Sequence, residues 1–130
     1  MSRAPYVREI PKFRWFFRQS RYVRYMTREL SCLFIGAYTL LLVVGIGRLA
    51  EGRAAYEAFL EGLKSPLSVA FHLLALAFAV YHSATWFNLT PKALPVQFGE
   101  EFLPGWMIAA AHYAAWLVLT LVILYCAGAF

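Results

Sequence analysis

Three long stretches without a charged residue dominate the chain, and short polar stretches separate them. The charge-free stretches cover residues 30–47, 65–91 and 102–130. A helix of about 20 mostly apolar residues, with a range of about 17–25, crosses the hydrocarbon core of a bilayer. Lipid offers no partners to backbone groups, so a spanning segment must be helical. The pattern therefore predicts an all-α membrane protein with three transmembrane helices, near residues 29–49, 66–89 and 104–129.

The segments between the predicted spans, 50–65 and 90–103, are short and polar. Glycine and proline residues typical of loops occur in them, namely Gly52, Gly62, Pro91, Pro95 and Gly99. By contrast, Pro66 and Pro104 stand where proline suits the first turn of a helix. We therefore interpret both segments as loops within one membrane domain, residues 29–130.

The composition agrees with a membrane protein and excludes two other classes. Apolar residues make up 62% of the 130 residues and charged residues 15%, against about 45–50% and about 25% in typical soluble domains. A chain this short cannot bury so much apolar surface in its own core. Intrinsic disorder is excluded because it needs low hydrophobicity. The excess apolar surface must therefore face lipid, a partner, or both.

The basic residues predict how the chain is oriented in the membrane. Eight of the 12 lie before the first predicted span: Arg3, Arg8, Lys12, Arg14, Arg18, Arg21, Arg24 and Arg28. Cytoplasmic segments carry the excess of Lys and Arg in membrane proteins. We therefore expect a multi-pass membrane protein with a cytoplasmic N-terminus and the C-terminus outside.

Residues 1–28 form a basic, aromatic N-terminal arm. Arginines alternate with Trp, Phe and Tyr between residues 13 and 25. The simpler interpretation is an interfacial cytoplasmic segment, with arginines on lipid phosphates and aromatic rings at the headgroup level. The alternative is a docking surface for a cytoplasmic partner. Basic and aromatic arms also bind nucleic acid, but three membrane spans argue against a nucleic-acid partner.

Ionisable residues inside spans are costly and therefore point to function; here they are Glu29, His72, His82 and His112. At 100° per residue, one face of the second span is small and polar: Ser68, His72, Ala75, Ala79, His82, Ser83 and Trp86. We expect this face to pack inward. The other face should meet lipid: Leu67, Leu73, Leu74, Ala77, Phe78, Val80 and Tyr81.

Depth along the spans groups three of these polar and aromatic residues. His82 lies about 10 Å from the cytoplasmic end of the second span, at 1.5 Å per residue. Glu29 stands at the cytoplasmic end of the first span, and Trp86 follows His82 by one helical turn. Such a set suits a quinone headgroup, since imidazole and indole N–H groups can donate to its carbonyls and a carboxylate can relay protons. A structural alternative for Glu29 is a charge at the positive N-terminal end of the first helix. For His72 and His112 we expect structural roles, and a structural role remains an alternative for His82.

Two cysteines at opposite ends of the spans, Cys32 and Cys126, are too far apart for a disulfide. No zinc or haem-attachment spacing occurs, so we expect no metal site. We also expect no catalytic residue in this chain taken alone.

Three segments together resemble a known family. The longest is residues 82–93, HSATWFNLTPKA, and the others are residues 5–8, PYVR, and residues 25–29, YMTRE. They resemble the C subunit of bacterial fumarate reductase, a small hydrophobic anchor subunit of the complex II superfamily, and the resemblance covers nearly the whole chain. It implies a complex with a flavoprotein subunit holding FAD, an iron–sulfur subunit and a second hydrophobic anchor.

The resemblance also implies a menaquinol-oxidation site near the iron–sulfur clusters. The residues of that site would be Arg28, Glu29, His82 and Trp86, with proton transfer at Glu29 and His82. The related succinate dehydrogenase anchors bind haem b, which needs axial ligands on two sides. His72 would require a second ligand from another chain, so we expect no haem b. The alternatives are a haem b anchor of a succinate dehydrogenase and a small membrane protein without a redox role.

Overall fold

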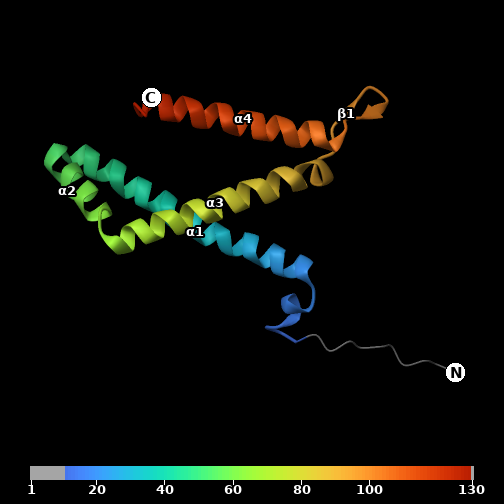
Figure 1. Cartoon of the computed structure of the whole chain (residues 1–130), viewed down its shortest axis with the longest axis horizontal. Coiled ribbons are helices and arrows are strands. Elements are labelled where there is room, and N and C mark those ends of the chain that lie inside the picture. Colours follow the sequence, from blue (N-terminus) through green and yellow to red (C-terminus); the bar gives the residue numbers. More distant parts are fainter. Residues whose placement is uncertain (1–10, 130) are drawn as a thin grey trace. The chain divides into compact units, whose positions relative to one another are not determined.

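The computed structural model describes residues 11–129. Arg3, Arg8 and the segment 5–8 lie outside the described residues. The chain divides into two compact units, Met1–Phe78 and Ala79–Phe130, and their boundary falls inside one helix. The described elements are η1 (Trp15–Arg18), α1 (Ser20–Glu51), α2 (Arg53–Leu63), α3 (Pro66–Ala93), β1 (Gln97–Phe98), β2 (Glu101–Phe102) and α4 (Gly105–Cys126), as Figure 1 shows.

Three helices of the described part of the chain are long and apolar enough to cross a membrane: α1, α3 and α4. All three predicted spans are therefore confirmed as helices, with shifted ends. Helix α1 begins at Ser20, so the end of the arm continues the helix of the first span. Its 32 residues correspond to about 48 Å, which exceeds the hydrocarbon core of about 30 Å. Helix α3 continues to Ala93 and therefore includes Pro91.

The connection between the first two spans is a helix, so the prediction of a loop there is wrong. Gly52 ends α1 with a φ of 120°, a conformation that favours glycine. The chain then turns into α2, whose apolar residues recur at the i, i+3, i+4, i+7 spacing of an amphipathic helix: Tyr56, Phe59, Leu60 and Leu63. Charged residues occupy the other face, where Arg53 pairs with Glu57 at 2.7 Å and Lys64 with Glu61 at 2.5 Å.

In the first unit, aromatic rings join α1 to the beginning of α3. Phe34 stacks on Phe78 with ring centroids 4.4 Å apart, and Tyr38 meets His72 edge to face at 5.4 Å. Ala75 is buried and His72 half-buried, as expected for the small, polar face. Phe78, assigned by sequence to the lipid face, instead packs on α1. A large planar ring can reach a neighbour from the edge of a helical face, which the angle of its Cα alone does not reveal.

Helix α2 packs against α1 through a close approach at Gly45. A Cβ at Gly45 would lie 3.0 Å from the Phe59 ring, so only glycine leaves room for that ring in its present place. Gly45 is accordingly buried although it lies in a predicted membrane span. The hydrogen atom of glycine thus allows α2 to fold back along the last turns of α1.

The second unit contains the end of α3, a small hairpin and α4. In the hairpin, Gln97 pairs with Phe102 and Phe98 with Glu101 in antiparallel register. Gly99 begins the two-residue turn with a φ of 66°, which suits the first position of a type II′ turn. The prediction of a loop for 90–103 is therefore wrong at both ends of the segment, because 90–93 are helical and the remainder contains a hairpin. Gly105 packs at the end of α3, where its missing Cβ would lie 3.1 Å from Pro91 Cβ.

Candidate site residues on two membrane helices

Arg28 and Glu29 lie well inside α1. Glu29 is nine residues after the first residue of the helix, Ser20, or about 13 Å along the axis. The positive end of a helix acts only within its first turn. The structural alternative for Glu29, a charge at the N-terminus of the helix, is therefore wrong. The Glu29 side chain is exposed within the chain, so it is open to a ligand, a partner or water.

Arg28 is half-buried, and its guanidinium carbon lies 5.4 Å from the centre of the Tyr25 ring. A cation over an aromatic face at this distance is attracted by the ring quadrupole. The Ser31 hydroxyl donates to the Arg28 carbonyl oxygen, and the Ser31 side chain is fully buried. Arg28 is thus half-buried near Tyr25 and the buried Ser31, whereas the side chain of the neighbouring Glu29 is exposed.

His82 and Trp86 are stacked along α3. Their ring centroids are 6.2 Å apart and their planes are inclined by 51°. His82 is half-buried, whereas Trp86 is 42% exposed. The pair therefore presents a flat indole surface beside an imidazole that can give or take a proton. The spacing of one helical turn, expected from the sequence, brings these two side chains together.

Side-chain hydrogen bonds brace α3 around this pair. Thr85 Oγ1 donates to the His82 carbonyl oxygen at 2.9 Å, and Thr90 Oγ1 donates to that of Trp86 at 2.9 Å. Asn88 Nδ2 donates both to the Ala84 carbonyl oxygen, at 2.7 Å, and to the Tyr113 hydroxyl of α4, at 3.0 Å. Local polar contacts thus fix the turn that carries His82 and Trp86 and tie it to α4.

The structure separates the four predicted site residues into two neighbouring pairs. Arg28 and Glu29 belong to the first unit, and His82 and Trp86 belong to the second. Their common depth in the membrane remains a prediction from the sequence. Between residues 11 and 129 no group of three or more His, Cys, Asp or Glu side chains could hold a metal ion.

The two other histidines make hydrogen bonds within their own helices. His72 Nδ1 donates to the Ser68 carbonyl oxygen at 2.7 Å. His112 Nδ1 donates to the Ile108 carbonyl oxygen, also at 2.7 Å, and its ring lies 5.5 Å from that of Phe87. Because a carbonyl oxygen only accepts, each Nδ1 carries a proton. Both rings are therefore held in place by local bonds, and a structural role for them stays a prediction.

Sequence reasoning missed Ser31, Asn88 and Tyr113. Ser31 follows Arg28 by one turn and is the fully buried polar residue of α1. The sequence does hold a signal for Ser31: it is a small polar residue within the charge-free stretch 30–47, one turn after Arg28. Asn88 lies two residues after Trp86, but its partner Tyr113 is 25 residues away in the chain. That contact requires α3 and α4 to pack together, which periodicity does not specify.

Comparison with known proteins connects these residues to a family. The family model for the C subunit of fumarate reductase matches residues 1–127. A fumarate reductase C subunit of Mycobacterium tuberculosis (strain CDC 1551 / Oshkosh) is 35% identical over 109 residues, which cover 84% of this chain and 86% of the relative. A Vibrio cholerae O1 protein of the same name is 35% identical over 123 residues, or 95% of this chain and 96% of the relative. The Aliivibrio fischeri (strain MJ11) protein is 33% identical over the same length and with the same coverage. The chain therefore belongs to the family of fumarate reductase C subunits.

Proposed function

We propose that the chain anchors a fumarate reductase to the cytoplasmic membrane and helps form the site where menaquinol is oxidised. Family membership and three membrane-spanning helices support the anchor role. The observation that carries the quinol site is the exposed indole of Trp86 beside the imidazole of His82 on α3. The partners of the chain would be a flavoprotein subunit with FAD, an iron–sulfur subunit and a second hydrophobic anchor.

The available side chains fit a quinol. Trp86 offers a flat apolar surface for a ring, and His82 offers a nitrogen for hydrogen bonding to a hydroxyl or carbonyl. When bound, menaquinol supplies two electrons and two protons, and the electrons leave through the iron–sulfur subunit to reduce fumarate to succinate. The isoprenoid tail would remain in lipid, which the exposed apolar faces of the helices adjoin.

Each site residue has a distinct task in this proposal. His82 hydrogen-bonds the ring oxygen and takes up a proton there. Glu29 accepts a proton at the cytoplasmic side of the first span and passes it to water, since its carboxylate is exposed within the chain. Arg28, held by Tyr25, positions Glu29 or contacts the partner subunit. Trp86 forms a wall of the site.

Replacement of Glu29 tests the proton-transfer role. In the purified complex, Glu29→Gln should lower quinol-dependent fumarate reduction by about 10²–10⁴-fold, the usual contribution of a positioned acid or base. Fumarate reduction from an artificial dye donor, which bypasses the membrane site, should be unchanged. Glu57→Gln is the matched control, because Glu57 is an exposed glutamate paired with Arg53 on α2.

Three outcomes would contradict the proposal. Full quinol activity in Glu29→Gln would remove the proton role of Glu29. Equal loss of both activities in Glu29→Gln, with the flavoprotein and iron–sulfur subunits still bound, would place the defect outside the quinol site. Recovery of the chain without those subunits, from membranes that keep other complexes intact, would overturn the anchor role itself.

A further inference from the structure

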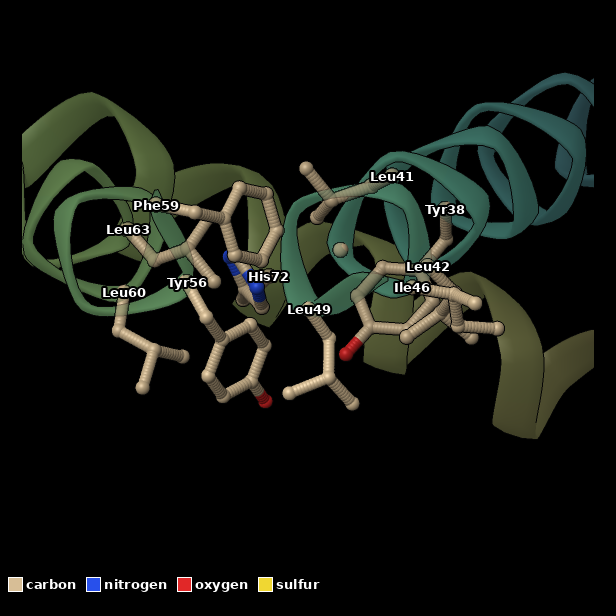
Figure 2. Close-up of a pocket in the computed structure, with 11 residues that line it drawn as sticks. Tyr38, Leu41, Leu42, Ile46, Leu49, Tyr56, Phe59, Leu60, Leu63 and His72 are labelled. Carbon is tan, nitrogen blue, oxygen red and sulfur yellow. The ribbon is translucent and has the colours of Figure 1, made fainter. Parts of the chain in front are cut away.

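An apolar cavity of about 330 Å³ lies between α1, α2 and the beginning of α3. Figure 2 shows its walls: leucine and isoleucine side chains from α1 on one side, and Tyr56, Phe59 and Leu60 from α2 on the other. All the lining residues belong to the first unit. The volume is about twice that of an engineered apolar cavity of about 150 Å³ that stays dry and binds benzene. A cavity of this size and lining is therefore suited to an apolar ligand.

The lining of the cavity follows two helices. Its lining extends along α1 from Tyr38 to Leu49 and along α2 from Tyr56 to Leu63. At 1.5 Å per residue, these distances are about 16 Å and about 10 Å. A lining that follows two helices over several turns offers apolar contacts along the length of a hydrocarbon chain.

Three polar groups interrupt the apolar lining: the hydroxyls of Tyr38 and Tyr56 and the ring of His72. In Figure 2 the two hydroxyl oxygens point to the same side of the cavity. His72 donates its Nδ1 proton to the Ser68 carbonyl oxygen, so in the neutral ring Nε2 is an acceptor. Tyrosine hydroxyls can donate to ester carbonyl oxygens, and Nε2 can accept from an ammonium or hydroxyl group. Glycerophospholipids carry ester carbonyls beside their acyl chains and an ammonium or hydroxyl group in many headgroups.

The surroundings of the cavity point to the same ligand. Helices α1 and α3 are membrane-spanning by length and composition, so the apolar medium around them is acyl chain. Helix α2 bears ion-paired charges on its other face, Arg53 with Glu57 and Lys64 with Glu61, as a helix at the level of lipid headgroups would. The cavity is thus bounded by membrane helices on one side and an interfacial helix on the other.

We propose that this cavity holds one acyl chain of a membrane phospholipid, whose ester region meets Tyr56 near the outer end of α1, while Tyr38 and His72 line the deeper part of the cavity. By the positive-inside orientation the lipid comes from the outer leaflet. The bound chain fills the space that α2 leaves when it folds back on α1, and it holds the two helices together. This binding site is independent of the proposed quinol chemistry.

Native mass spectrometry of the complex, purified in mild detergent, tests the proposal by counting retained phospholipids. Leu41→Trp places a large ring at a lining position and should lower the count by one per copy of the chain. Leu40→Trp is the matched control, because Leu40 lies next in sequence, is 67% exposed and does not line the cavity. Its lipid count should equal that of the unmodified protein.

Leu60→Trp fills the cavity from α2 and replaces the first variant if Leu41→Trp prevents assembly. Equal phospholipid counts in the cavity-filling and control variants would overturn the proposal. Selective loss of a bound quinone, with the phospholipids unchanged, would assign the cavity to an isoprenoid tail instead. A photo-reactive amino acid at Leu42 that cross-links a second polypeptide and no phospholipid would show that a partner occupies the space.

Discussion

The contact between Gly45 and Phe59 predicts how firmly α2 is held against α1. Gly45→Ala would place a Cβ 3.0 Å from Phe59 Cε1 and 3.2 Å from Cζ. Carbon atoms in good contact are about 3.5–4.0 Å apart, so the ring must move by several tenths of an ångström. The same ring lies 6.2 Å from Tyr56, centre to centre, in a nearly parallel stack. It therefore cannot move without disturbing the face by which α2 packs.

Overpacking of this kind costs about 1–3 kcal/mol, and we expect about 1–2 kcal/mol because the ring edge can partly yield. That free energy corresponds to about a 5- to 30-fold change in an equilibrium constant. Hydrogen exchange of the α2 amides in a detergent micelle or nanodisc measures this local opening directly. In Gly45→Ala the α2 amides should exchange about 5- to 30-fold faster than in the unmodified chain.

Gly47→Ala is the matched control. It lies on the same helix and makes the same chemical change, but no atom lies within 4 Å of the added Cβ. Both substitutions stabilise the α1 helix by about 1 kcal/mol through helix propensity, so only the contact with Phe59 distinguishes them. In a Phe59→Leu background the extra effect of Gly45→Ala should disappear, as expected for two directly coupled residues. Equal α2 exchange in Gly45→Ala and Gly47→Ala would refute the reasoning.

Three further predictions concern the second unit and the orientation. Asn88→Ala should weaken the attachment of α4 by about 0.5–1.5 kcal/mol because its bond to Tyr113 is lost. Tyr113→Phe removes that bond and also the longer bond from the Tyr113 hydroxyl to the Ala84 carbonyl oxygen, so it should weaken the attachment at least as much. Fully additive effects of the two substitutions on α4 hydrogen exchange would contradict the pairing. Trp86→Leu should lower kcat/KM for quinol by about 2- to 12-fold, the range for one lost aromatic contact. The control Trp106→Leu, at a position 71% exposed, should have no effect. Equal losses in the two variants would argue against contact between Trp86 and the quinol ring. With Cys32 and Cys126 replaced by Ser, a membrane-impermeant maleimide should label Arg53→Cys in intact cells and Lys12→Cys only after the membrane is opened. The reverse labelling pattern would invert the orientation.

Much of the fold was predictable from sequence. The free-energy cost of placing a charge in hydrocarbon depends only on the segment that carries the charge. The long stretches without charged residues therefore predict α1, α3 and α4 without knowledge of the neighbouring helices. The pairing of His82 with Trp86 is equally local, because it needs only one turn of helix. Three residues of the candidate site, Glu29, His82 and Trp86, could therefore be proposed without a structure, and the family resemblance adds Arg28; their role stays a prediction.

The ends of the elements were harder to predict. Charges at residues 48, 51 and 53 marked the end of a span, but a helix can continue through charged residues once it leaves the lipid. Helix α2 was not predicted because its segment is short and polar and holds two glycines typical of loops. Its apolar residues nevertheless follow the i, i+3, i+4, i+7 spacing of a helix: Tyr56, Phe59, Leu60 and Leu63. The extension of α3 to Ala93 is not predicted by the sequence, because proline beyond the first turn removes a backbone hydrogen bond, clashes with the preceding turn and commonly ends a helix.

The sequence by itself thus determined that this protein spans a membrane three times and where its costly polar residues lie along each helix. Only the tertiary structure decided that Phe78 packs on Phe34, that Asn88 reaches Tyr113 and that α2 folds back over Gly45 to leave a cavity beside His72. The physical reason is that the insertion of a helix into lipid depends on the sum of the transfer free energies of its own residues. This sum can be calculated from the sequence of that segment alone. Packing between helices depends on shape and on small residues at contacts, and residues far apart in the chain supply these.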